Sequence, residues 1–119
     1  MNETELKRVY RHERLRKKLK GTTDRPRVCV HRSLTNFYAQ VIDDDNGKVL
    51  CGMSTLNKEI KSKVKYGGNV HAAEILGEVF AKKVIGTGIK KVCFDRGGYK
   101  FHGRVKAFAE AMRTGGMEF

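Results

Sequence analysis

Apolar and polar residues alternate over three short stretches in the first half of the chain. Residues 27–33, 37–43 and 48–55 each show this two-residue period and contain many β-branched or aromatic side chains, which predicts strands. The tetrapeptide Asp-Asp-Asn-Gly at 44–47 predicts a tight turn before the third strand, because Asn-Gly tolerates positive φ. We therefore expect an antiparallel meander.

In the second half of the chain, apolar residues recur every three to four positions, which is the period of a helix. Asn69 can cap a helix that runs to about Ile85, and a second helix is expected from His102 to Arg113. A short apolar run at 90–95 predicts a fourth strand between them. The lysine-rich stretch 56–68 predicts a mobile or short-helical connection.

The predicted order is βββαβα, which indicates an α/β domain of the α+β type. Two helices with one apolar face each can cover one face of a four-stranded mixed sheet. Alternation turns Val28 and Val30 toward the helices. It leaves His31, Tyr38 and Gln40 on the opposite face, which should be open, polar and aromatic. Such a face suits RNA.

Positive charge is concentrated at the start of the chain. The sequence has 25 Lys and Arg against 13 Asp and Glu, a formal net charge of +12. Residues 1–32 hold 11 of those bases and four of the acids. We predict a basic RNA-binding arm at 1–22, flexible when free, and a globular RNA-binding domain at 23–119. The alternative is a solvated tail that aids solubility.

A glycine-rich stretch from Asp95 to Arg104 separates the fourth strand from the last helix. Glycines let a backbone approach a ligand closely, and N–H groups at a helix start favour anions. In this interpretation Arg96 and Arg104 pair with phosphates and Tyr99 stacks on a base or sugar. The alternative is a turn with a structural role only. The stretch matches neither G-x-G-x-x-G nor a Walker motif, so no nucleotide cofactor is expected.

Several classes of protein are disfavoured by the sequence. No apolar stretch suits a membrane span or a signal peptide, so we expect a cytoplasmic protein with no membrane partner and no small-molecule substrate. Cys29, Cys51 and Cys93 lack C-x-x-C spacing, and the histidines are scattered, so neither metal nor cofactor is expected. We expect the cysteines to be buried thiols on strands rather than a disulfide or zinc set.

Two other nucleic-acid functions stay open at this point. Carboxylates at Asp43 and Asp95 could hold Mg²⁺ in a ribonuclease, although their positions at a turn and a strand end favour a structural role. We therefore expect no enzyme and no catalytic residue. A DNA-binding protein is the other alternative.

The chain resembles the bacterial L18 family of large-subunit ribosomal proteins over nearly all of its 119 residues. The motifs that carry this resemblance are Arg14-Leu15-Arg16-Lys17-Lys18, Arg25-Pro26-Arg27, Val30-His31-Arg32-Ser33, Tyr38-Ala39-Gln40-Val41-Ile42-Asp43, Phe94-Asp95-Arg96-Gly97-Gly98-Tyr99 and His102-Gly103-Arg104-Val105-Lys106-Ala107. Glu3 and Glu5 make the start of the arm less basic than in many members. The cysteines are not part of the family pattern.

The resemblance implies a structural constituent of the large subunit, bound to the ribosome. It implies binding of 5S rRNA and its attachment to the large-subunit rRNA in the central protuberance, beside neighbouring large-subunit proteins. The resemblance implies that three sets of residues contact RNA. Those of the arm are Arg8, Arg11, Arg14, Arg16, Lys17 and Lys18. Those of the sheet are Arg25, Arg27, His31, Arg32, Ser33, Tyr38 and Gln40, and those of the glycine-rich loop are Arg96, Gly97, Gly98, Tyr99, His102, Gly103 and Arg104.

Overall fold

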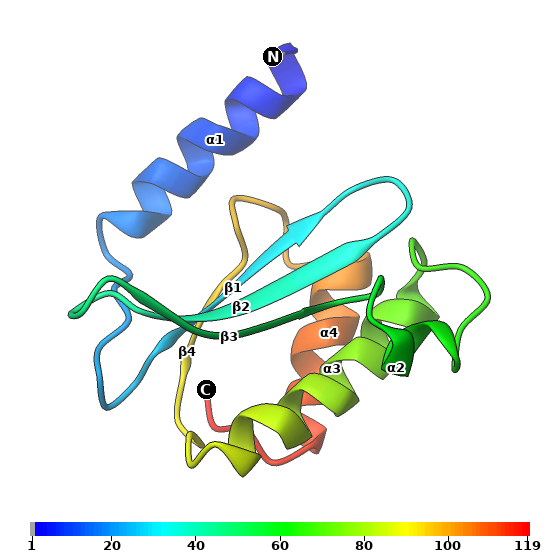
Figure 1. Ribbon diagram of the computed structural model, residues 1–119. Helices are drawn as coiled ribbons and strands as arrows, with labels where there is room; N and C mark the ends of the chain where they lie inside the picture. Colours follow the sequence, from blue (N-terminus) through cyan, green and yellow to red (C-terminus); the bar gives the residue numbers. More distant parts are fainter. Residues whose placement is uncertain (1) are drawn as a thin grey trace.

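One four-stranded mixed sheet carries the fold, with helices on both of its faces (Figure 1). A computed structural model describes residues 2–119; Met1 of the predicted arm lies outside this range. The elements are α1 (Glu3–Arg16), β1 (Arg27–Arg32), β2 (Phe37–Asp43), β3 (Lys48–Ser54), α2 (Lys58–Lys61), α3 (Val70–Gly86), β4 (Cys93–Asp95) and α4 (Gly103–Thr114). The predicted class is confirmed, and two helices, α1 and α2, are added to the predicted order.

The strands lie in the order β3-β2-β1-β4. β1 pairs antiparallel with β2, and β2 with β3, which confirms the predicted meander. β4 pairs parallel with β1 and is shorter than the predicted strand at 90–95. The reason is that Lys91 pairs with Glu118 near the C-terminus in an isolated bridge outside the four-stranded sheet.

The core lies between the sheet and the helix pair α3 and α4 (Figure 1). Val28 and Val30 point into it, as the alternation predicts. Asn69 caps α3 by accepting a hydrogen bond from the backbone N–H of Ala72 at 2.8 Å, which confirms the predicted helix start. Gly77 allows α3 and α4 to approach closely, since a Cβ there would lie 2.7 Å from the carbonyl oxygen of Phe108.

The predicted arm contains a continuous helix, α1. No residue of α1 is buried, so the helix has no apolar stripe that a sequence pattern could reveal. Local electrostatics favours it instead. Asn2 caps its N-terminus, Glu3 and Glu5 occupy the first turn, and Arg14 and Arg16 the last, as the helix dipole prefers.

Among the described residues, none of the helices is both long and apolar enough to cross a lipid bilayer.

Candidate nucleic-acid interface

The glycine-rich loop is the docking site of α1. Arg8 donates from Nη1 to the carbonyl oxygen of Gly97 at 2.7 Å, and Arg11 donates from Nε to that of Gly98 at 3.0 Å. Gly98 has φ +82°, and a Cβ there would overlap the carbonyl oxygen of Arg8. Gly97 and Gly98 therefore lie beneath the helix, and their carbonyl groups are directed to its arginines.

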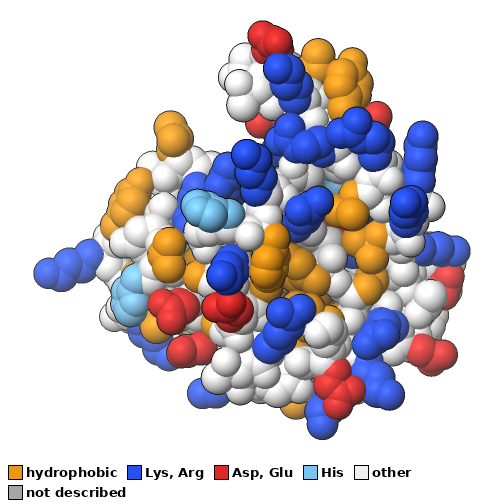
Figure 2. Space-filling view, turned by 180° about the vertical axis from the view of Figure 1, so that it is seen from behind, with side chains coloured by type: hydrophobic (Ala, Val, Ile, Leu, Met, Phe, Trp, Pro, Cys, Tyr) orange, Lys and Arg blue, Asp and Glu red, His pale blue; other side chains and the backbone are white. Residues whose placement is uncertain are grey.

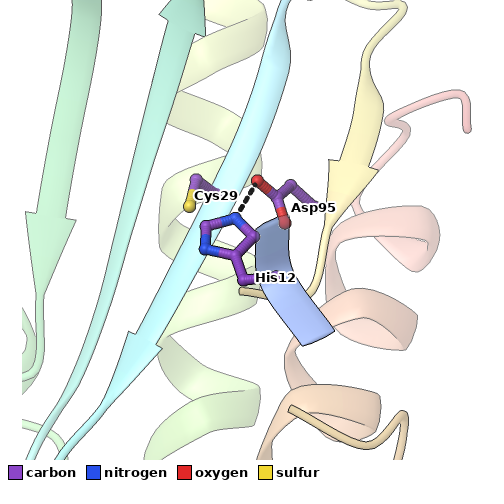
Figure 3. A group of neighbouring side chains, drawn as sticks. All are labelled: His12, Cys29 and Asp95. Carbon is purple, nitrogen blue, oxygen red and sulfur yellow. Dashed lines mark hydrogen bonds and ion pairs between the residues drawn. The ribbon is translucent and has the colours of Figure 1, made fainter. Parts of the chain in front are cut away.

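A buried ion-pair network fixes this docking further. His12 Nε2 lies 2.8 Å from Asp95 Oδ2 (Figure 3). Arg27 Nη1 lies 2.6 Å from the same oxygen. Burial of Asp95 opposes its ionisation, but hydrogen bonds from His12, the Gly97 N–H and Arg27 outweigh burial and hold its pKa below the ordinary value. Arg27 also pairs with Asp44 at 3.0 Å. The network thus joins α1, β1, β4 and the β2–β3 turn.

Figure 3 also shows Cys29 beside His12 and Asp95, a combination that could in principle hold a metal. One observation speaks against that use. The oxygens of Asp95 already accept hydrogen bonds from His12, Arg27 and the Gly97 N–H. The cluster is a satisfied structural network.

The same network disfavours the ribonuclease alternative. Asp95 is fully buried and neutralised by Arg27. Asp43 accepts hydrogen bonds from the backbone N–H of Asp45 and the side-chain amide of Asn46, which is the role of a turn residue. Neither carboxylate is presented to a metal-bound substrate.

α1, the end of β1, the glycine loop and the start of α4 together form a groove lined mainly by basic side chains. We call it the basic groove. Its lining residues are Thr4, Glu5, Arg8, Arg11, Arg32, Ser33, Leu34, Tyr99, Lys100, His102 and Arg104. Figure 2 shows Lys and Arg side chains gathered along the helix at the top of that view and on the face below it. The fold therefore brings predicted residues from three separate sequence segments into one place.

Tyr99 lies at the floor of the basic groove. Its side chain is 6% exposed, and the guanidinium carbons of Arg8 and Arg32 each lie 4.8 Å from its ring centroid. Its hydroxyl lies 2.9 Å from His31 Nδ1. Burial and the charge of Arg8 lower the pKa of His31, which favours the neutral imidazole. The hydroxyl also lies 3.3 Å from the carbonyl oxygen of Arg32. Tyr99 therefore positions two arginines within the protein.

The groove keeps its positive charge because only one of its four arginines, Arg8, pairs with a carboxylate. Arg11 donates to the carbonyl oxygen of Gly98, and Arg104 donates to that of Ser33 at 2.8 Å. Burial and the nearby charge of Arg32 lower the pKa of Arg104, the sign of crowded like charges. Of the groove's lining residues only Glu5 is acidic, and it pairs with Arg8. A bound anion would relieve this crowding.

The open side of the sheet forms a second, shallower depression beside the groove. His31, Tyr38 and Gln40 line it, as the alternation predicts, together with Ser33. The His31 and Tyr38 rings lie 5.7 Å apart. Since α1 docks over Cys29 and Asp95, it approaches this same face near β1 and β4 and leaves the β2 and β3 part uncovered.

Other predicted residues lie elsewhere. Arg27 is 6% exposed, and its charge is used inside the ion-pair network. Arg25 lies in a different depression, with Arg113 and Phe119. Gly103 begins α4, and Arg96 is exposed in the glycine loop. The remaining predicted residues, Arg14, Arg16, Lys17 and Lys18, follow Arg11 along α1 and its C-terminal end.

Sequence reasoning missed one cation of the basic groove, Lys100, and one residue that docks α1, His12. Lys100 lines the basic groove and belongs to the glycine-rich stretch, so its position was a usable signal. The sequence gave no signal for His12, because its partner Asp95 is 83 residues away.

Residues 2–119 match the sequence model of the family described as ribosomal L18 of archaea, bacteria, mitochondria and chloroplast. A protein of Pelotomaculum thermopropionicum called large ribosomal subunit protein uL18 is 59% identical over 112 residues, 94% of this chain and 92% of its own length. Proteins of the same name are similar to the chain in Acetivibrio thermocellus, at 55% identity over the same shares, and in Dictyoglomus thermophilum, at 51% over 97% of this chain and 93% of the relative.

Proposed function

Because the chain belongs to the ribosomal L18 family, we propose that it binds 5S rRNA and helps attach it to the large-subunit rRNA. The coarser part of this function follows from the family itself. The protein is a structural constituent of the large ribosomal subunit, is bound to the ribosome in the cytoplasm, and is not an enzyme.

The observation that carries the proposal is the basic groove. Its cations come from α1, β1, the glycine loop and the start of α4. Arg11 and Arg104 are held by bonds to neutral carbonyl groups, which preserves their charge. Folded RNA presents phosphates and 2′-hydroxyls in a fixed shape, and such contacts position a protein without reading a long sequence. A rigid set of cations suits this type of recognition.

The other predicted residues have distinct roles in this proposal. The exposed cations Arg14, Lys17 and Lys18 extend the contact along the RNA backbone beyond the groove. Tyr38 and Gln40 offer a ring and an amide on the uncovered part of the sheet, where an unpaired base can stack or form hydrogen bonds. We place the complex in the central protuberance, beside neighbouring large-subunit proteins.

The test is the affinity for 5S rRNA as a function of salt. The double variant Arg32→Gln, Lys100→Gln removes two charges of the groove. Its plot of log affinity against log salt should be shallower than that of the wild type by about 1.5, since each phosphate contact contributes about 0.7 to 0.9 to the slope. Lys82→Gln, Lys91→Gln removes two exposed lysines outside the groove and should leave the slope unchanged.

Wild-type protein that fails to bind 5S rRNA even in dilute buffer would defeat the proposal. Duplex DNA serves as the competitor, and equal affinity for both would favour the DNA-binding alternative.

A further inference from the structure

A second group of cations lies outside the basic groove, in the segment 58–66, here called the lysine segment. Its four lysines are all exposed, and its single acidic residue is Glu59. Within the described chain, none of the four forms an ion pair. These residues are Lys58, Lys61, Lys63 and Lys65. The proposed contact of the groove with 5S rRNA does not use them.

The lysine segment is held in one conformation by the core. Ile60 is fully buried, and Val64 packs against the core cluster. The two glycines that follow fit closely against the β1–β2 turn: a Cβ on Gly67 would lie 2.8 Å from the carbonyl oxygen of Thr35, and one on Gly68 would overlap that of Leu34. The lysines are thus displayed from a fixed backbone, and their mutual repulsion is not relieved by the protein itself.

Tyr66 adds an aromatic surface at the end of this segment. Its hydroxyl donates to the carbonyl oxygen of Leu34 at 2.8 Å, which fixes the side chain. The residue is nevertheless 49% exposed, so part of its ring faces solvent with its polar atom already satisfied. A fixed aromatic ring beside unpaired cations is a typical platform for a stacked base above a bound backbone.

The lysine segment and the basic groove meet at the β1–β2 turn. Figure 1 shows α2, which begins the lysine segment, well apart from α1. Leu34 connects the two surfaces, because it lines the groove and accepts the hydrogen bond from Tyr66. An RNA held against α1 and a second RNA held against α2 could therefore come together over this turn.

We propose that the lysine segment is a second RNA-binding surface, which binds a segment of large-subunit rRNA while the basic groove holds 5S rRNA. The inference rests on the proposed function and adds the residues that bridge the two RNAs. Lys58, Lys61, Lys63 and Lys65 contact phosphates, and Tyr66 stacks on a base.

The experiment compares two fourfold variants with the same change in charge. In the test variant Lys58, Lys61, Lys63 and Lys65 are replaced by Gln; in the control, the exposed Lys48, Lys82, Lys91 and Lys106 are replaced. Each protein is assayed for 5S rRNA affinity and then, as the preformed 5S complex, for capture of a large-subunit rRNA transcript.

We expect the test variant to match the control in 5S affinity. Its capture of large-subunit rRNA should fall at least tenfold at moderate salt, with a salt slope shallower by about 3, because up to four phosphate contacts are lost. Tyr66→Phe keeps the ring and should retain capture, whereas Tyr66→Ala should weaken it. Melting curves establish that each variant is folded.

The outcomes separate this inference from the proposed function. Failure of the wild type to bind 5S rRNA defeats the proposed function. Normal 5S binding together with equal capture by the test and control variants defeats the second surface alone. A selective loss of 5S affinity in the test variant would show one continuous 5S surface and would also overturn the inference.

Discussion

The ring of Tyr99 is only 6% exposed and lies beneath the guanidinium groups of Arg8 and Arg32. We expect Tyr99→Ala to lower the free energy of unfolding by about 3 kcal/mol, because it leaves a cavity where an aromatic ring was buried. Tyr99→Phe keeps the ring, loses the hydrogen bond to His31, and should lower it by about 1 kcal/mol. Urea denaturation followed by circular dichroism measures both. An unchanged stability of Tyr99→Ala would contradict the positioning role.

A second residue-scale prediction concerns acid. The hydrogen bond from Arg27 holds the pKa of Asp44 below its ordinary value, and His12, Gly97 and Arg27 do the same for the buried Asp95. A depressed carboxylate pKa stabilises the fold fully above the unfolded value of about 3.9, and this contribution is lost as the pH falls through the lower folded value. The free energy of unfolding should therefore decline below about pH 4.

Asp44→Asn tests this assignment. It removes one titrating partner of Arg27, so its free energy of unfolding should depend less on pH between about 2 and 4 than that of the wild type. Asp24→Asn changes an exposed carboxylate outside the network and should keep the wild-type profile. Parallel profiles for all three proteins would contradict the role of the network in acid stability.

These residue-level pairings could not be read from the sequence. Arg27 and Asp95 were each noticed, but as an RNA contact and as a possible metal ligand. Their pairing depends on the parallel register of β1 and β4, which places Arg27 opposite Cys93 and Cys29 opposite Asp95. Register between strands distant in the chain is set by the assembled core and has no local pattern.

At the scale of elements, α1 depends on the glycine loop for its position. Gly98→Ala should release α1, because the added Cβ overlaps the carbonyl oxygen of Arg8 and lies 3.0 Å from the backbone nitrogen of His12. Amide hydrogen exchange should become faster in α1 and stay slow in β1 and β2.

Gly88→Ala is the matched control. Gly88 also has positive φ, at +93°, but a Cβ there would meet no atom within 4 Å. It should destabilise the whole fold by about 1 kcal/mol through backbone strain without a selective effect on α1. Equal exchange of α1 in both variants would show that the loop does not hold the helix. The prediction that the arm is flexible when free is tested by the same measurement on the wild type.

Elements with an amphipathic period were predictable in their bounds. For the stretch 56–68 the sequence left a mobile or a short-helical connection open, and the structure has the short helix α2 there. The three alternating strands, the α3 cap at Asn69 and the start of α4 near His102 follow the sequence prediction closely. β1, β2, α3 and α4 each bury an apolar face, and burial is what produces a period. β3 buries only Met53. α1 buries none, and α2 has only Ile60 buried, so both helices lie in segments whose pattern is dominated by charge.

At the scale of the whole molecule, charge determines how strongly the protein holds RNA. Deleting residues 2–20 removes eight Lys or Arg and three Glu, together with one wall of the basic groove. Affinity for 5S rRNA should fall, and the salt slope should become shallower by several units at about 0.7 to 0.9 per lost phosphate contact. Fluorescence anisotropy over a salt series measures both quantities. A truncated protein with the full slope would show that α1 does not contact the RNA.

The sequence predicted most of the residues that belong to the candidate site, but it did not predict how they contact one another. The excess of bases before residue 33 and the glycine-rich stretch identified most of the groove's lining residues. That Gly97 and Gly98 accept hydrogen bonds from α1 was hidden, because glycine permits close approach of any group, whether a ligand or another part of the same chain.

The long separation between His12 and Asp95, 83 residues, has a consequence for synthesis of the protein. The N-terminal helix leaves the translating ribosome first, but residues 95–98, against which it docks, are among the last quarter of the chain to emerge. A nascent chain that lacks residues 95–98 carries the cationic helix α1 without the loop on which it docks. Its attachment is therefore a late event in folding, and a product truncated before Asp95 never reaches it.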